Sequence, residues 1–340
     1  MAVKAEIYSP QEFQFAYKAE TSYGTKLNTT MSLMNVDDLV SVQRDVTQTL
    51  EPRSGSSGRV LSASDINTTD KGGHRSTISM SVILDNALMI VLLEQIVGKA
   101  KATIGNIAEA ITLDYNYTPA EILDNEVMST NLGGFTLCMI SPIANESIYF
   151  TGCVLEQIVI KAERTADGGR FHADLTWATE YRPADAAAAP TTPTLYGASF
   201  HYLRELLLRT VDAEDLVVNK LELTITNPGI WAGYQGSNGD PEAMTRAIPR
   251  VEPSLLLGVK YDTYTAPYWQ TFRANSIMSI ELGAKAGTWD HADNTFGFKA
   301  AFAKLKGNPQ PAGTDQGVFQ DIEFELGAST AGVILTAAVG

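Results

Sequence analysis

Two stretches of the sequence decide the fold: Thr77–Asp85, which reads TISMSVILD, and Ser254–Asp262, which reads SLLLGVKYD. In the first stretch every second residue is hydrophobic: Ile78, Met80, Val82 and Leu84. Side chains with this period lie on one face of a strand, so the stretch predicts a half-buried strand that ends at Asp85. The second stretch repeats the pattern 177 residues later, with Leu255, Leu257, Val259 and Tyr261 at the matching positions.

The same offset holds on both sides of the two strands. Upstream, the β-like run Asp38–Thr49 matches Asp215–Thr226, and each run leads into a loop rich in turn residues. A slip of one residue would turn the hydrophobic side chains to the opposite face of the sheet. A constant offset over about fifty positions therefore favours an internal repeat.

Each strand is followed by a predicted helix. Asn86–Val97 (NALMIVLLEQIV) is apolar at helical spacing, whereas its counterpart Thr263–Phe272 contains Pro267 and is expected to be shorter or distorted. Asp85 and Asp262 stand immediately before these segments. We interpret both as helix N-caps rather than catalytic carboxylates.

The chain divides at residues 182–195 (RPADAAAAPTTPTL), where prolines and alanines without periodicity predict a semi-stiff linker. We expect a mainly β protein made of two tandem copies of one domain, each a β-sandwich or partial barrel with a short flanking helix. The first domain would span residues 1–185 and the second 196–340, with 186–195 as the linker between them. Further strands are expected at Tyr149–Ile160, Phe171–Trp177, Ile277–Leu282, Phe296–Phe302 and Val318–Leu326.

Each predicted domain contains one long segment without a regular pattern. Residues 50–76 of the first domain and 227–250 of the second are longer than ordinary hairpin loops. Two copies of a long arm on a repeated β domain predict that each arm reaches a neighbouring subunit. A surface hairpin without a partner is the alternative.

The bulk composition excludes several classes of protein. The net charge is −14 and the pI about 4.7, so the chain is not expected to hold a phosphate backbone, although acidic soluble proteins are common. No run of about 18 apolar residues predicts a membrane span, and the opening residues do not predict a signal peptide. The two cysteines, Cys138 and Cys153, are interpreted as small buried hydrophobic residues in a reducing compartment.

No catalytic motif is present, and no catalytic, cofactor-binding or metal-binding residue is assigned. The cluster Asp290, His291 and Asp293 could ligate a metal, but solvated turn residues are the alternative that we favour. Gly55–Gly58 lies in a loop of the wrong length to cradle a phosphate. We interpret the remaining candidates for acid–base chemistry as structural residues: His74, His172, His201, Asp37-Asp38 and Glu214-Asp215.

Three segments carry a resemblance to a known family. Ala16–Thr29 (AYKAETSYGTKLNT) contains a Glu-x-x-x-Gly-Thr pattern, Tyr149–Tyr181 has an aromatic-Thr-Gly-Cys strand followed by a glycine turn, and Leu216–Pro228 (LVVNKLELTITNP) resembles a strand that opens a second half. These segments resemble the tail tube proteins of long-tailed bacteriophages, in the form with two domains in one chain. The likeness covers nearly the whole chain.

The resemblance implies a structural protein of the virion tail, assembled in the host cytoplasm, with no enzyme activity and no cofactor. Chains of this form would make trimeric rings that mimic sixfold symmetry and stack into the conduit for DNA ejection. The implied partners are further copies of the chain, the tape measure, terminator and distal tail proteins, and genomic DNA that passes without specific binding. No membrane contact is implied.

Three alternatives stay open at this point: a distal tail protein, a tube subunit of a secretion system, and a β-sandwich carbohydrate-binding module. The last would use exposed aromatic residues, for which Tyr264, Tyr268 and Trp269 are candidates, although core packing is favoured because the first repeat has Leu and Val there.

Overall fold

Antiparallel strands make up most of the described part of this chain, as the alternating sequence pattern predicts. The computed structural model describes residues 12–21, 24–37, 41–46, 74–97, 109–114, 134–195, 200–226, 229–230, 234–235, 240–241, 245–246, 252–263, 265–287, 289, 296–307, 309, 311–314, 317–327 and 333–339. Two α-helices lie within these residues, and neither is long and apolar enough to cross a membrane.

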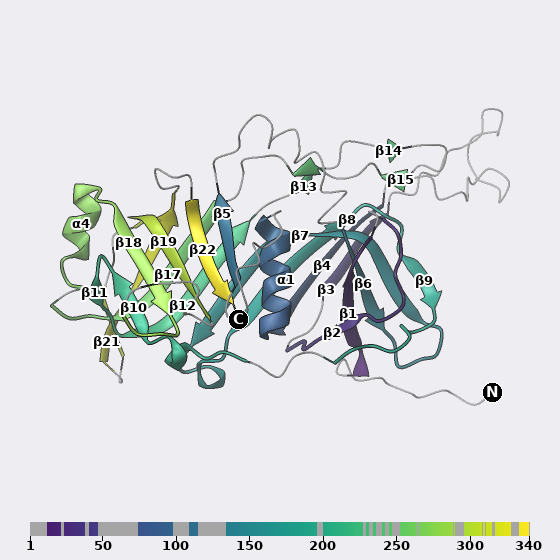
Figure 1. The fold of residues 1–340 in the computed structure, drawn as a ribbon, viewed down its shortest axis with the longest axis horizontal. Coiled ribbons are helices and arrows are strands. Elements are labelled where there is room, and N and C mark those ends of the chain that lie inside the picture. The colour runs from purple at the N-terminus through teal and green to yellow at the C-terminus, as the bar shows by residue number, and fades with distance from the viewer. Residues whose placement is uncertain are drawn as a thin grey trace, which may run out of the picture.

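The N-terminal half contains nine strands and a helix in its described part: β1 (Gln14–Ala19), β2 (Ser32–Met34), β3 (Ser41–Val46), β4 (His74–Ile83), α1 (Asn86–Val97), β5 (Glu109–Asp114), β6 (Phe135–Ile140), β7 (Ser147–Glu163), β8 (His172–Thr179) and β9 (Ala184–Ala187). A one-turn 3-10 helix, η2 (Asp167–Gly169), joins β7 to β8. Figure 1 shows this half on the right, with α1 in the middle of the molecule.

The C-terminal half follows with a second set of elements: η3 (Leu203–Glu205), β10 (Leu208–Val211), β11 (Glu214–Asp215), β12 (Val218–Thr226), β17 (Glu252–Lys260), α4 (Tyr268–Ala274), β18 (Met278–Gly283), β19 (Phe296–Leu305), β20 (Pro311–Thr314), β21 (Gly317–Leu326) and β22 (Val333–Val339). In Figure 1 this half occupies the left, with α4 at the far end.

One sheet runs through both halves, with neighbouring strands in the order β3-β4-β8-β7-β12-β17-β21. The long strand β7 holds the N-terminal half together because its beginning pairs with β6 and β9 whereas its end pairs with β8 and β12. The hydrophobic side chains of both halves form a single main core.

The strand pairings of the N-terminal half recur in the C-terminal half. The pairs β1–β2, β1–β6, β6–β7, β7–β8, β7–β9, β4–β8 and β3–β4 correspond to β10–β11, β10–β18, β18–β19, β19–β21, β19–β22, β17–β21 and β12–β17. An irregularity between Phe135 and Leu137 in the β6–β7 pair also has its counterpart, between Met278 and Ile280 in the β18–β19 pair.

The principal difference between the halves lies in one strand. Where the N-terminal half has the continuous β7, the C-terminal half has β19 and then β20, which both pair with β21 in the way that β7 pairs with β8. In addition, β5 of the N-terminal half pairs with β22 of the C-terminal half.

The predicted inward faces are largely as expected. Ile78, Met80, Val82 and Leu84 are buried, and so are Leu255, Leu257 and Val259. Tyr261 is the exception, because 40% of its surface is exposed. The prediction that Tyr261 packs in the core was therefore wrong.

A helix follows each of the two matching strands, as predicted. α1 has the predicted bounds, and the backbone N–H of Leu88 donates to Asp85 Oδ1 at 2.9 Å. α4 is shorter, as predicted, because it begins only after Pro267. Asp262 Oδ1 accepts from the backbone N–H of Thr265 at 3.2 Å, so this carboxylate caps the preceding turn and not α4 itself.

The Ala- and Pro-rich segment predicted as a linker is paired with the N-terminal half. β9 lies in it and pairs with β7, and Thr191 and Thr194 form parallel bridges with Thr29 and Ser32. Most of the arm at 50–76 lies outside the described residues. The described parts of 227–250 form nested antiparallel pairs, β13 (Gly229–Ile230) with β16 (Thr245–Arg246) and β14 (Tyr234–Gln235) with β15 (Asp240–Pro241).

Candidate assembly interface

The two halves are joined through backbone pairing between β7 and β12. Lys220 lies opposite Glu163 at one end of this ladder and Thr226 lies opposite Gln157 at the other. The side chains that face the core from the two strands are almost fully buried: Ile158, Ile160, Ala162, Leu221, Leu223 and Ile225. The boundary between the halves is thus an ordinary part of a sheet and its core.

The sheet has an open edge at each end within the described residues. β3 pairs with β4 on one side, and β20 pairs with β21 on one side. Their other sides have no strand partner among the described elements. Unpaired N–H and C=O groups along a strand edge are a template for another strand.

One face of the sheet carries charged and polar side chains from each of its central strands, with Val159 and Leu256 among them. Its charged side chains, from β4, β8, β7, β12, β17 and β21, are Glu163, Asp174, Glu222, Asp321, Glu323 and Glu325, with Arg75, Lys161, Lys220 and Lys260. Acidic side chains outnumber basic ones among these described positions. Lys161 Nζ lies 2.5 Å from Asp174 Oδ2, and Lys220 Nζ lies 3.9 Å from Asp321 Oδ2.

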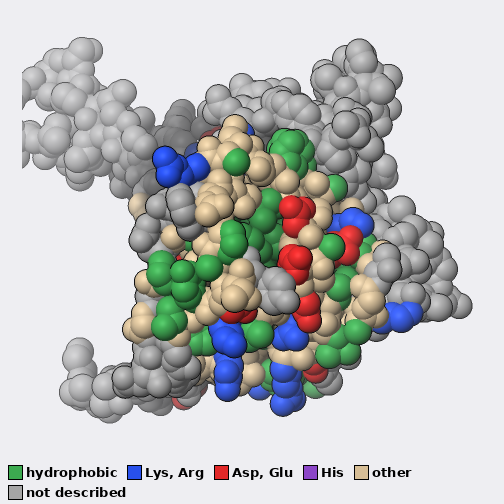
Figure 2. Space-filling model, turned by 90° about the vertical axis from the view of Figure 1, so that its left-hand side faces the viewer, with side chains coloured by type: hydrophobic (Ala, Val, Ile, Leu, Met, Phe, Trp, Pro, Cys, Tyr) green, Lys and Arg blue, Asp and Glu red, His purple; other side chains and the backbone are tan. Residues whose placement is uncertain are grey.

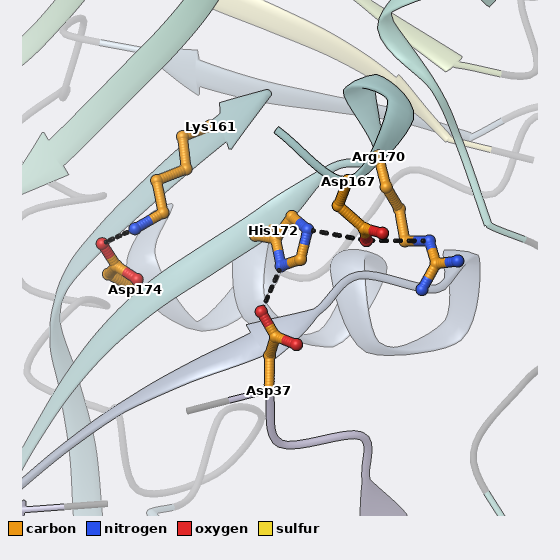
Figure 3. A network of polar contacts seen from close by, with 6 residues as sticks. All are labelled: Asp37, Lys161, Asp167, Arg170, His172 and Asp174. Atoms are coloured by element: carbon orange, nitrogen blue, oxygen red, sulfur yellow. Dashed lines mark hydrogen bonds and ion pairs between the residues drawn. The ribbon is translucent and has the colours of Figure 1, made fainter. Parts of the chain in front are cut away.

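A cluster of charged side chains surrounds the start of β8 (Figure 3). His172 Nδ1 lies 3.1 Å from Asp37 Oδ2, and its Nε2 lies 3.3 Å from Asp167 Oδ2. Arg170 Nε in turn lies 3.4 Å from the same oxygen of Asp167. The cluster holds the loop after β2, the turn at η2 and strand β8 together, and it contains no nucleophile that a histidine base would activate.

The Glu-x-x-x-Gly-Thr segment has a structural role at the end of β1. Glu20 is 6% exposed, and its carboxylate accepts from the backbone N–H groups of Gly24 (2.6 Å) and Gly152 (2.8 Å) and from Thr136 Oγ1 (2.9 Å). Burial raises the pKa of Glu20, and these three hydrogen bonds oppose the rise. Gly24 has φ of +76°, and a Cβ there would lie 2.3 Å from the Tyr181 ring.

The remaining candidates do not converge on a site. The His201 side chain contacts Asn86 and Glu205, whereas that of His172 contacts Asp37 and Asp167, and burial lowers the pKa of His201. Asp290, His291 and Asp293, the side chain of His74, and Gly55–Gly58 lie outside the described residues. Within the described part of the chain, no group of three or more His, Cys, Asp or Glu residues could hold a metal ion.

The aromatic and cysteine candidates are mostly in the core. Tyr268 is 6% exposed, which favours core packing over a sugar platform, whereas the side chains of Tyr264 and Trp269 are outside the described residues. Cys138 and Cys153 are free thiols with no exposed surface, as expected for small hydrophobic residues. Burial raises the pKa of Cys138 to about 12.

The described residues define the class as a mainly β protein that presents extended sheet surfaces with open edges and a charged face. The chain belongs to the phage tail tube protein family, whose model matches residues 12–326. Members of this family are structural components of the virion tail. Membership implies assembly with further copies of the same chain and with other tail proteins. No curated protein matches the chain.

Proposed function

We propose that this chain is the major tail tube subunit of a long-tailed phage. It consists of two tandem tube domains, three chains form a ring with six domain positions, and rings stack into the conduit for DNA ejection. Its partners are other copies of itself, the tape measure, terminator and distal tail proteins. Assembly takes place in the host cytoplasm, and the DNA passes without specific binding.

The observation that carries this proposal is the β7–β12 ladder between two halves with the same strand pairings. A protein with two like units and one heterologous contact between them can repeat that contact with the next molecule. If the second half meets the next chain as the first half meets the second, the rotation is repeated at every boundary. A ring results when this rotation closes.

The repeat gives the strands and the register of the contact between chains. β20 corresponds to the end of β7, and β3 corresponds to β12. The pairs Glu222–Lys161 and Leu223–Ile160 of the internal ladder then become Ser41–Ala312 and Val42–Pro311 between neighbouring chains. Closure in this way pairs the open edges of β3 and β20.

The polar face of the sheet is the surface that would line the lumen, because the opposite face is covered by the core. Lysines that lie beside carboxylates, as Lys161 lies beside Asp174, present little free positive charge to a phosphate backbone. The excess of acidic side chains on this face then repels DNA and allows the strand to slide.

Cysteine cross-linking tests the ring. In the variant Ser41→Cys/Ala312→Cys, mild oxidation of assembled protein is expected to give covalent dimers and trimers on a non-reducing gel, and electron microscopy should show rings with a central hole. The control is Ser41→Cys/Gly313→Cys, in which the shift by one residue points the second thiol to the opposite face of the sheet. Monomers without rings at every concentration would contradict the proposal.

A further inference from the structure

A short segment covers one end of the N-terminal half. The amide of Leu84 donates to the carbonyl of Phe171, and the amide of Phe171 donates to the carbonyl of His201 at 3.0 Å. Two antiparallel bridges fix the covering segment further, Asp85 with Phe200 and Arg170 with Tyr202. We refer to residues 200–206 as the cover segment.

The cover segment and the neighbouring strand β19 shield Leu84 and Phe171 from solvent. Leu84 is 2% exposed and Phe171 is 1% exposed. The Phe171 ring lies 4.6 Å from the Phe296 ring, and His201 stacks on Phe296 with centroids 4.5 Å apart. All of these covering groups belong to the C-terminal half of the chain.

The same end of the C-terminal half has no cover among the described residues. The amide of Tyr261 donates to the carbonyl of Val318 at 2.9 Å, as Leu84 does to Phe171. The turn that follows is also repeated, because Ala266 N–H donates to Asp262 O as Met89 N–H donates to Asp85 O. Yet Tyr261 is 40% exposed and Val318 is 45% exposed.

Val217 extends this exposed surface. Its carbonyl accepts from the amide of Lys260, next to Tyr261, and its side chain is 52% exposed. We call Val217, Tyr261 and Val318 the Tyr261 patch. Figure 2 looks onto the end of the molecule formed by the C-terminal half and shows exposed hydrophobic side chains beside a group of acidic ones.

The sequence before β1 has the spacing of a second cover segment. β1 and β10 correspond, because Gln14 lies opposite Ile140 at the end of β6 and Leu208 lies opposite Gly283 at the end of β18. Tyr8 precedes Gln14 by the same number of residues as Tyr202 precedes Leu208. The residues before β1, Glu6–Glu12 (EIYSPQE), thus include an aromatic residue where the cover segment has one.

We propose that the Tyr261 patch is the docking site for residues 6–12 of the next chain in the ring. This inference rests on the proposed ring, and it adds a contact that the paired strand edges do not supply. Glu6 would lie opposite Asp262, and Tyr8 opposite Gly317, as Phe200 and Tyr202 lie opposite Asp85 and Arg170. Burial of the patch by a neighbour supplies a hydrophobic contribution to assembly.

A pair of cysteines placed at one of these contacts tests the docking. Gly317→Cys/Tyr8→Cys, oxidised after assembly, is expected to give dimers and trimers that disappear on reduction. Each single-cysteine variant should give neither dimers nor trimers, because the native Cys138 and Cys153 have no exposed surface and cannot react with the introduced thiol.

The outcomes separate this inference from the proposed function. Rings that form in the double variant without cross-linked chains would overturn the docking and leave the ring intact. Cross-links found only in stacked tubes and not in single rings would assign the patch to stacking and also overturn it. A wild-type protein that forms no rings would overturn the proposed function itself.

A second measurement does not depend on cross-linking. Tyr261→Ser changes an exposed side chain, so the melting temperature of the subunit should stay within a degree or two. The concentration needed for ring formation should rise about tenfold, which corresponds to about 1.4 kcal/mol. Leu195→Ser, at a side chain that is 75% exposed elsewhere, is the matched control and should leave assembly unchanged. Equal assembly of both variants would contradict the proposal.

Discussion

Ile160 lies directly opposite Leu223 in the sheet, and neither side chain has any exposed surface. This contact crosses the boundary between the two halves of the chain. Leu223→Ala should therefore lower the free energy of unfolding of the whole subunit by about 2–5 kcal/mol, because it leaves a cavity in a shared core.

Urea denaturation of the subunit measures this effect. Leu207→Ala is the matched control, since Leu207 is 56% exposed and its truncation should change stability by less than about 0.5 kcal/mol. If the two variants were equally stable, the boundary would not be part of the core.

Gly24 is predicted to tolerate no side chain. Gly24→Ala combines a positive φ with a Cβ placed 2.3 Å from the Tyr181 ring. Gly168 also has a positive φ, of +65°, but nothing lies within 4 Å of a Cβ there. Gly168→Ala should cost about 1 kcal/mol from backbone strain alone, and Gly24→Ala should cost clearly more. Thermal denaturation of both variants separates the steric contribution from the backbone one.

Glu20 should make the stability of the subunit depend on pH. Its pKa in the folded chain is raised above the ordinary value of 4.5 by burial, so the folded state binds the proton more tightly than the unfolded state. The resulting stabilisation is fully present below pH 4.5 and is lost as the pH rises through the higher, folded-state pKa.

The variant Glu20→Gln should remove this part of the pH dependence. It should also cost about 1–3 kcal/mol at neutral pH, because an amide cannot accept all three hydrogen bonds of the carboxylate. Urea midpoints measured from pH 4 to 8 test both effects. A variant with the wild-type slope would show that another group is responsible.

Asp85 is predicted to stabilise the start of α1. Asp85→Ala removes the acceptor for the Leu88 amide and should cost about 1 kcal/mol, whereas Asp85→Asn keeps an acceptor oxygen and should cost much less. Melting temperatures of the two variants give the comparison. Equal losses in both would mean that the charge of Asp85, rather than its hydrogen bond, stabilises this end of the helix.

Local pattern was enough to predict the strands and the first helix. The alternation around Val82 and Val259 gave the correct inward face in both halves, and the apolar spacing of Asn86–Val97 gave α1 with its observed bounds. These features depend on residues that are close in the sequence. Pro267 likewise predicts the shortened second helix, α4.

Contacts between distant segments could not be predicted in this way. Nothing in the sequence of Ala184–Ala187 indicates a strand, because alanine has a low β propensity, and its place comes from pairing with β7. The exposure of Tyr261 was missed for a related reason. Its position in the alternating pattern is that of Leu84, but among the described residues a cover segment lies over Leu84 and none lies over Tyr261. The β7–β12 ladder was also not anticipated, although the alternation of Ile158, Ile160 and Ala162 was visible.

The pairing of β5 with β22 has a consequence for the synthesis of the subunit. Asp114 of β5 lies opposite Val333 of β22, so β5 is synthesised long before the strand with which it pairs. Contacts of such large sequence separation slow folding, since the chain entropy is lost before the contact forms. The sheet of the C-terminal half is completed only once β22 has been made. Translation products interrupted before β22 therefore leave β5 without this partner strand.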